Sequence, residues 1–90
     1  MKYAVRRTSR LKRDMKKLLK GGKDIEKLIK AVEILAEGQI LPSEYKDHPL
    51  SGKYKGMCDC HIEPDWILIY GMEENELVLY RTGSHSDLFR

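Results

Sequence analysis

The apolar residues of this chain change their spacing once along its length, and that change constrains the fold more than any other feature. Before residue 40 they recur every three or four positions, as on one face of a helix. After residue 53 they occur in short runs bounded by turn residues, as in strands. Two helical segments followed by three strand-like runs predict an α+β fold, with a helical hairpin on one face of a small antiparallel sheet. With 90 residues, we expect a single domain over residues 1–90.

The two helical segments carry their own start and stop signals. Thr8 or Ser9 is a candidate N-cap of the first helix, and a Gly-Gly pair at 21–22 ends it. Its apolar stripe consists of Leu11, Met15, Leu18 and Leu19. The second helix follows the capping residue Asp24 and ends at Gly38. Its stripe consists of Ile25, Leu28, Ile29, Val32 and Leu35. The pattern predicts a hairpin with one apolar side.

The three strand-like runs span residues 54–62, 66–72 and 76–82. Short turns between them predict an antiparallel meander, and alternation around Tyr3 and Val5 predicts an N-terminal strand that joins it. Between the hairpin and the meander, residues 40–52 lose all periodicity and contain proline and glycine. We expect a long connecting loop there, of a kind that is often functional.

Alternation along the strands predicts which side chains share a face of the sheet. Cys58 and Cys60 lie on one side of their run and His61 on the other, so His61 faces outward if the cysteines face the helices. Arg81 shares a side with Leu79, and we expect it to reach solvent only because its strand is ending.

The two cysteines are predicted to be small buried residues. At positions i and i+2 of a strand they lie about 7 Å apart, too far for an unstrained disulfide. A zinc site formed by Cys58, Cys60 and His61 is an alternative, but a second Cys or His pair at zinc-finger spacing is missing. No metal and no cofactor are expected.

Positive charge is concentrated near the N-terminus. Residues 1–23 carry ten basic residues and one acidic residue, a net charge of +9, whereas residues 24–90 have a net charge of −6. The helical period places five basic side chains opposite the first apolar stripe: Arg10, Arg13, Lys16, Lys17 and Lys20. This face indicates a polyanionic partner, although a solvated face that only aids solubility has the same pattern. No apolar run is long enough for a membrane span, and a cytoplasmic protein with no membrane partner is expected.

The second half of the chain contains groups that suit cleavage of RNA. Attack by the 2′-hydroxyl needs a base, an acid and positive charge on the phosphorane oxygens. Histidine titrates near neutral pH, arginine binds phosphate through planar donors, and aromatic rings stack on unpaired bases. The candidates are His48, His61, Asp65, Trp66, Arg81, His85 and Phe89. Structural alternatives remain, because Trp66 suits a core and Arg81 could pair with Asp59 or Asp65.

Three segments make the chain resemble a known family. They are residues 45–50 (YKDHPL), 61–70 (HIEPDWILIY) and 81–89 (RTGSHSDLF). In this order they resemble the YafQ branch of the RelE/ParE toxins, the toxin halves of bacterial type II toxin–antitoxin pairs, almost from end to end. The resemblance implies a RelE-like fold and an endoribonuclease that cuts mRNA, typically in the ribosomal A site. The implied partners are the ribosome, mRNA and a DinJ-like or RelB-like antitoxin encoded nearby.

The resemblance also implies roles for single residues. The acid–base positions correspond to His48, His61, Asp65 and His85, the phosphate-stabilising arginine to Arg81, and an active C-terminal aromatic to Phe89. We expect His85 to be the general acid and Asp65 or His48 the base, with Trp66 shaping the site and the basic helix binding ribosomal RNA. The alternatives are a ribosome-independent RNase and a non-catalytic ParE-like toxin that binds a protein target. The full acid–base set argues against the latter.

Overall fold

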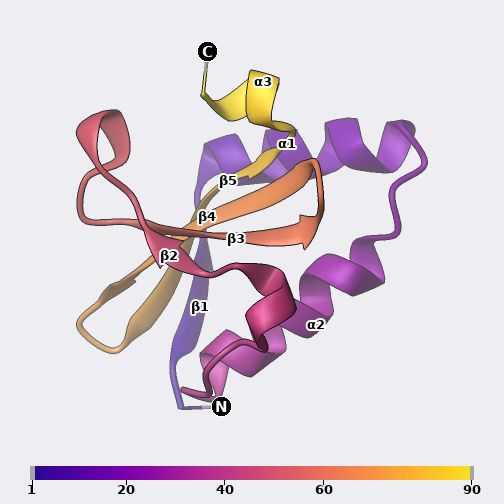
Figure 1. Cartoon of the computed structure of the whole chain (residues 1–90). Coiled ribbons are helices and arrows are strands. Elements are labelled where there is room, and N and C mark those ends of the chain that lie inside the picture. Colours follow the sequence, from indigo (N-terminus) through magenta and orange to yellow (C-terminus); the bar gives the residue numbers. More distant parts are fainter. Residues whose placement is uncertain (1, 90) are drawn as a thin grey trace.

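Five strands form one sheet in the order β1-β5-β4-β3-β2 in the computed structural model, which describes residues 2–89. The antiparallel meander consists of β3 (Cys58–Glu63), β4 (Trp66–Glu73) and β5 (Glu76–Gly83). At one edge β1 (Ala4–Arg7) runs parallel to β5, and at the other β2 (His48–Pro49) runs antiparallel to β3. Figure 1 shows this arrangement, with the C-terminal segment beside the end of β5.

Three helices and two short 3₁₀ turns make up the other regular elements of residues 2–89. The helices are α1 (Ser9–Lys20), α2 (Ile25–Ala36) and α3 (His85–Leu88), and the 3₁₀ turns are η1 (Ser43–Tyr45) and η2 (Gly52–Tyr54). Thr8 caps α1 by accepting a hydrogen bond from the N–H of Leu11 at 3.1 Å. The same hydroxyl donates to the carbonyl of Tyr80 at 2.9 Å, so the cap also attaches α1 to β5.

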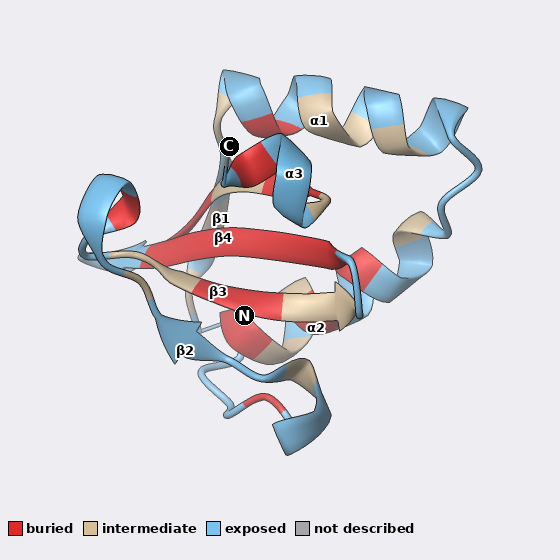
Figure 2. Ribbon diagram, turned by 45° about the horizontal axis from the view of Figure 1, so that its top comes forward, coloured by how far each residue is buried: buried red, intermediate tan, exposed pale blue. Residues whose placement is uncertain are grey.

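The sheet has a core on each side. We call the side covered by α1 and α2 the inner face and the opposite side the outer face. The inner core consists of Leu11, Leu28, Ala31, Leu35, Ala36, Leu41, Cys60, Trp66, Leu68, Tyr70, Leu77 and Leu79. On the outer face Ile67 and Ile69 pack against Tyr54 of η2 and Leu88 of α3. Alternate residues of β4 serve the two cores, which explains its unbroken apolar run and its burial in Figure 2.

The predicted α+β architecture is confirmed, including the helical hairpin and the meander. Several local predictions are wrong. The connection at residues 40–52 contains a strand, β2, and the meander begins at Cys58 because Tyr54 lies in η2 and packs into the outer core. Leu19 and Ile29, both expected in the apolar stripes, are 58% and 40% exposed. Within residues 2–89, no helix has the length and apolarity to cross a membrane.

A β-bulge in β5 decides on which face Arg81 lies. Tyr70 of β4 pairs with Leu79 of β5. The next pair joins Ile69 to Arg81, so Tyr80 is an extra residue between the two pairs. An extra residue reverses the alternation, and Arg81 therefore shares the outer face with Ile69. Arg81 leaves the face of Leu79 because of this bulge, and not because its strand ends, since β5 continues beyond it.

Candidate active site

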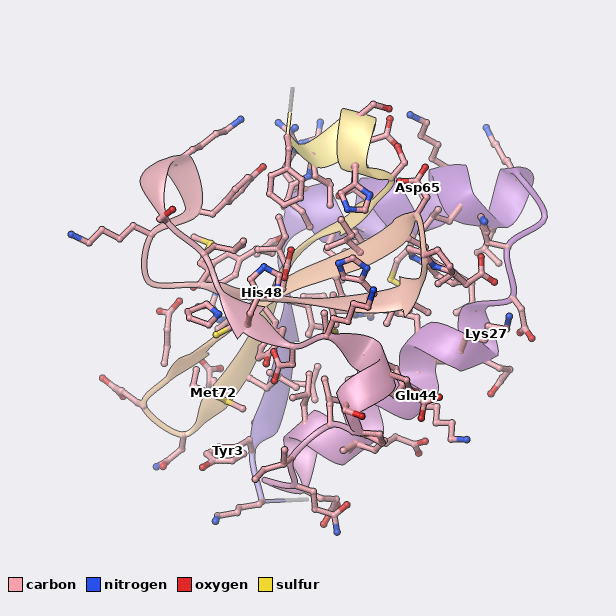
Figure 3. All side chains as sticks on the ribbon, viewed as in Figure 1. Tyr3, Lys27, Glu44, His48, Asp65 and Met72 are labelled. Atoms are coloured by element: carbon pink, nitrogen blue, oxygen red, sulfur yellow. The ribbon has the colours of Figure 1, made fainter. Side chains whose placement is uncertain are left out.

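Four predicted catalytic side chains gather on the outer face between β2 and α3. His48 comes from β2, His61 from β3, Asp65 from the turn between β3 and β4, and His85 from the start of α3. Asp59 of β3 joins them, because it pairs with His48 across the strands and shares a face of β3 with His61. Figure 3 shows His48 on β2 and Asp65 at the turn near α3.

Asp65 holds both the backbone and the ring of His85. Its Oδ1 accepts a hydrogen bond from the N–H of His85 at 3.0 Å and lies 2.7 Å from Nδ1 of the ring. The pKa of Asp65 is lowered below its ordinary value, mainly by the hydrogen bond from the backbone N–H of His85 and next by the contact with the His85 ring. Asp65 is therefore ionised at neutral pH and orients the imidazole, leaving Nε2 for a substrate, as orienting carboxylates do.

His48 is held at the same ring nitrogen by a carbonyl and a carboxylate. Its Nδ1 lies 2.9 Å from the carbonyl oxygen of Lys46 and 2.9 Å from Oδ1 of Asp59. Only the Lys46 contact has hydrogen-bond direction, and among the described residues Oδ1 of Asp59 lacks a directed partner. Asp59 is 3% exposed, and burial raises its pKa, while the three histidines act in the opposite direction. A buried carboxylate thus lies within electrostatic reach of all three imidazoles.

His61 lies next to both carboxylate–histidine pairs. Its ring centroid is 5.4 Å from that of His85, and the ring planes meet at 71°. It also contributes to the electrostatic environment of Asp59. The outer face therefore presents three imidazoles close together, and imidazole is the group that general acid–base catalysis uses most often.

The turn that starts α3 requires glycine. Gly83 has a φ of +156°, and a Cβ at this position would lie 3.2 Å from a carboxylate oxygen of Asp87. Ser84 then caps α3 by accepting from the N–H of Asp87 at 3.2 Å, while Asp87 accepts from the N–H of Ser84 at 3.2 Å. The ammonium group of Lys17 lies 3.3 Å from Asp87, so α1 contributes to the position of α3.

Contacts at the end of α3 place an aromatic ring beside His85. The hydroxyl of Tyr54 donates to the carbonyl of Leu88 at 3.0 Å. Phe89 packs edge-on against Tyr54, with ring centroids 5.8 Å apart, and its centroid is 6.2 Å from that of His85. Phe89 remains 42% exposed. A partly exposed ring in a fixed position can stack on a base, as predicted for this residue.

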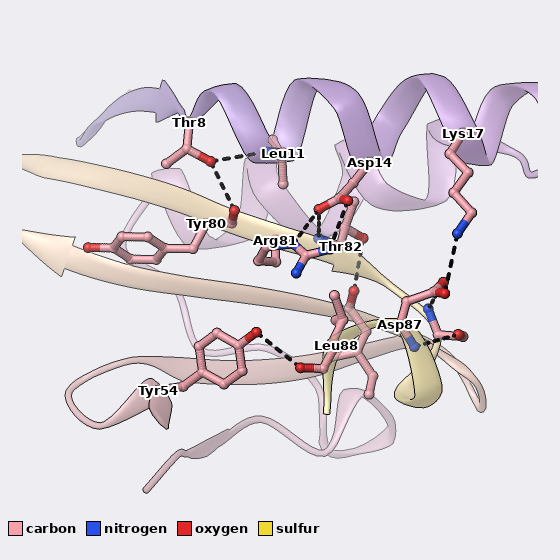
Figure 4. Close-up of polar contacts among 12 residues, drawn as sticks. Thr8, Leu11, Asp14, Lys17, Tyr54, Tyr80, Arg81, Thr82, Asp87 and Leu88 are labelled. Carbon is pink, nitrogen blue, oxygen red and sulfur yellow. Dashed lines mark hydrogen bonds and ion pairs between the residues drawn. The ribbon is translucent and has the colours of Figure 1, made fainter. Parts of the chain in front are cut away.

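Arg81 is paired with Asp14 of α1, and not with Asp59 or Asp65 as the sequence alternative supposed. Its Nε and Nη2 donate to the two carboxylate oxygens at 2.9 and 3.1 Å (Figure 4). Asp14 also accepts from the N–H of Thr82 at 3.2 Å. The hydrogen bond to Asp14 raises the pKa of Arg81 further. The bidentate contact gives the guanidinium group one defined orientation.

Trp66 does not present a surface for stacking. The side chain lies in the inner core, the residue is 0% exposed, and Nε1 donates to the hydroxyl of Thr82 at 2.9 Å. That hydroxyl donates in turn to the carbonyl of Ile67 at 2.8 Å. The prediction that Trp66 contacts RNA is therefore wrong, because the core covers the ring. Its structural role is to support the end of β5, next to Arg81.

The basic side chains predicted to bind ribosomal RNA all lie on α1 and are exposed: Arg10, Arg13, Lys16, Lys17 and Lys20. Lys17 is the member that also contacts α3, through Asp87. The basic face therefore borders the helix that carries His85.

The cysteines lie away from the three histidines His48, His61 and His85, which we call the histidine cluster. Cys60 is buried in the inner core, and Cys58 packs against that core, whereas His61 is on the outer face. Burial raises the pKa of Cys60 to about 12, so its thiol stays protonated. Among residues 2–89, no three His, Cys, Asp or Glu side chains are placed to hold a metal ion together.

Three residues that support the site were not singled out from the sequence. Asp59 had a signal, since it alternates with His61 on the same strand. Asp14 and Tyr54 had none, because their partners Arg81 and Leu88 are far away in the sequence. Only the folded chain brings these groups together.

Comparison with known proteins identifies the family of this chain. The profile of the family described as a bacterial toxin of type II toxin–antitoxin systems, YafQ, matches residues 3–90. The mRNA interferase toxin YafQ of Escherichia coli K12 is 46% identical over 78 residues, which cover 86% of this chain and 85% of that protein. The structure of the E. coli DinJ-YafQ toxin–antitoxin complex matches with a TM-score of 0.90 and 40% identity over 100% of both chains. A metal-bound toxin from Helicobacter pylori matches with a TM-score of 0.91 and 43% identity over 97% of this chain and 99% of that one. This chain belongs to the YafQ family of bacterial type II toxin–antitoxin toxins.

Proposed function

We propose that this toxin cleaves mRNA on translating ribosomes, without a metal ion, by attack of the substrate's own 2′-hydroxyl. The observation that carries the proposal is the convergence on one exposed face of two histidines that each lie beside a carboxylate, His48 beside Asp59 and His85 beside Asp65. His61 lies next to both pairs. The E. coli relative, an mRNA interferase by name, supports the class of substrate.

The geometry supports His48 as the base and His85 as the acid. Nδ1 of each ring is engaged, so Nε2 is the nitrogen that exchanges a proton with RNA. Asp65 is less suited to be the base, because its pKa is lowered and its Oδ1 already has two contacts to His85. His61 is placed to assist either proton transfer.

The reaction then proceeds in one displacement. His48 removes the proton of the 2′-hydroxyl, and the 2′-oxygen forms a bond to phosphorus. The bond from phosphorus to the 5′-oxygen breaks, and His85 gives that oxygen its proton. The products are a 2′,3′-cyclic phosphate and a 5′-hydroxyl end. Arg81 stabilises the charge on the phosphorane oxygens through the donors that Asp14 leaves available.

The proposed partners follow from charge and from the relatives. The basic face of α1 would bind ribosomal RNA beside the site, since phosphate contacts dominate such binding. An antitoxin similar to DinJ would neutralise the toxin, as the solved complex of the E. coli relative supports. Because ribosomes are the proposed site of action, we infer a cytoplasmic protein.

Cleavage of a free RNA oligonucleotide at high protein concentration tests the chemistry. We expect cleavage to survive EDTA, because the proposed proton transfers use histidines alone. A 2′-deoxy nucleotide at the cut position should abolish the reaction, since it removes the nucleophile. Replacement of His85 by Ala should lower the rate about 10²–10⁴-fold while the circular dichroism spectrum stays unchanged.

The possible outcomes separate the parts of the proposal. Activity that EDTA removes and added metal restores would contradict the metal-free mechanism, a relevant possibility because the H. pylori relative has been solved with a bound metal. Continued cutting at a 2′-deoxy position would require water as the nucleophile. Full activity of the His85 variant would disprove its role as acid.

A further inference from the structure

A pocket of about 310 Å³ opens directly beside His61. One wall is formed by Glu44 and Tyr45 of η1 and by the following residue, Lys46. The other wall is the end of β3 around His61 and Glu63. Because His61 belongs to both the pocket and the histidine cluster, any group bound in the pocket lies next to that cluster.

The walls of the pocket carry an aromatic ring and two carboxylates. Tyr45 is half-buried and packs against the inner core, so its position is fixed. Glu63 is held by Lys23 and Lys27, whose ammonium groups lie 2.9 and 2.8 Å from its oxygens. The hydrogen bond from Lys27 lowers the pKa of Glu63, which therefore stays ionised as an acceptor. Glu44 supplies a second, exposed carboxylate.

Lys46 lies between the pocket and the histidine cluster. It has a left-handed backbone conformation, with a φ of +49°, which is uncommon for a residue with a side chain. Its carbonyl oxygen lies 2.9 Å from Nδ1 of His48. Such conformations are often retained where a site requires them. The same residue thus lines the pocket and orients the proposed base.

We propose that this pocket binds the base of a nucleotide next to the scissile phosphate and selects adenine or cytosine over uracil. The proposal rests on the endoribonuclease function proposed above. Proteins read splayed RNA bases by aromatic stacking and by hydrogen bonds to base edges, and Tyr45 with the two carboxylates provides both. Adenine and cytosine donate through their amino groups at C6 and C4. Uracil presents the carbonyl O4 there, which a carboxylate repels.

Mapping of cut sites in translated reporter mRNAs tests the selection. The reporters carry each of the four bases at every position flanking a cut, and the variant is Glu44→Gln. We expect the toxin to disfavour uracil about tenfold at one flanking position, the size of one good base contact. Glutamine can donate to O4 of uracil, so Glu44→Gln should reduce that ratio to about threefold or less. Glu74→Gln, an exposed residue in the β4–β5 turn, is the matched control and should keep the ratio.

Binding of mononucleotides separates this proposal from the proposed function. In NMR titrations of the full chain, AMP should shift the amides of residues 44–46 and 61–63, and UMP should shift them less. This readout needs no cleavage, so a toxin that cuts no RNA but shows these shifts would disprove only the nuclease. Equal shifts with both nucleotides, or shifts confined to other surfaces, would overturn the pocket assignment. The pocket assignment would also be overturned if the toxin is active and Glu44→Gln disfavours uracil as strongly as the unmodified chain does.

Discussion

Asp59 is the buried carboxylate of the candidate site and interacts with all three histidines. Its carboxylate lies 2.9 Å from His48 and close enough to His61 and His85 for each to affect its ionisation. Burying an ionised carboxylate without a directed hydrogen bond is unfavourable. The unfavourable arrangement is consistent with a functional group, because perturbed titratable residues gather in active sites. Asp59 acts through the histidines and is a positioning residue.

Replacing Asp59 by Asn should lower kcat about 10- to 100-fold, less than the loss of an acid–base group itself. The pKa of Asp59 is raised in the folded protein, so its contribution to stability is present below the unfolded pKa of about 3.9 and is lost as the pH rises through the folded value. Asparagine does not ionise. We therefore expect the variant to gain Tm relative to the unmodified chain at about pH 7 but not at about pH 3.

Thermal unfolding across this pH range, with kcat and its pH profile measured in parallel, checks the prediction. Asp24→Asn is the control, because asparagine also caps helices and Asp24 is exposed and is not among the groups that shift the pKa of Asp59. A Tm difference that does not change with pH, or an unchanged pH profile of kcat, would argue against the assigned role.

Among the elements, α1 has a different role on each of its two sides. Its inner side contributes Leu11 to the core. Asp14 of the same helix accepts a hydrogen bond from Arg81 and so orients this arginine of the site. Its outer side carries the exposed basic residues. The only acidic residue in the segment 1–23 is thus the one that orients an arginine of the site, while the uncompensated positive charge remains exposed to solvent.

Removing single charges from the exposed side of α1 should weaken binding to ribosomes without changing the chemistry. For Arg13→Gln and Lys16→Gln we expect affinity to depend less steeply on salt. The slope of log affinity against log salt concentration should become less negative by about one for each phosphate that α1 no longer neutralises. Lys30→Gln on α2, also exposed, is the control and should leave the slope unchanged. Ribosome binding measured over a salt series provides the slopes. If the slopes of all three variants equal that of the unmodified chain, the exposed side of α1 only aids solubility.

Across the whole molecule, charge and catalytic groups occupy adjoining regions. The segment 1–23 has a net charge of +9 and the rest of the chain −6. Because Lys17 contacts Asp87 of α3, the positive segment borders the cluster that contains His85. An RNA-rich particle that binds α1 would therefore bring its mRNA close to the histidines. This arrangement favours a toxin that acts on bound mRNA over one that acts on free RNA.

Ribosome dependence can be tested in cells by induction of the toxin and mapping of mRNA 5′ ends. We expect cuts within a translated reporter to vanish when its start codon is removed, because the transcript then no longer enters ribosomes. A second reporter that keeps its start codon serves as the internal control. Cuts that persist in the untranslated reporter at the same positions would support the ribosome-independent alternative.

Local patterns in the sequence were enough to predict the secondary structure and most members of the site. Apolar spacing depends on the local geometry of helix and strand, so the hairpin and the meander could be predicted from it. The positions of His61 and of the cysteines on opposite faces followed from alternation along one strand, and the structure confirms them. Chemistry identified His48, His85 and Phe89 as candidates, because few residue types titrate near neutral pH or stack on bases.

How these groups are arranged depends on the tertiary structure. The bulge at Tyr80 moved Arg81 to the outer face, and Asp14, 67 residues away in the sequence, became its partner. Burial of Trp66 removed it from the RNA-facing surface, although its position next to Asp65 suggested otherwise. These outcomes follow from contacts between distant segments and from one extra residue in a strand. Neither leaves a periodic signal in the sequence, because local spacing records only which way neighbouring side chains point.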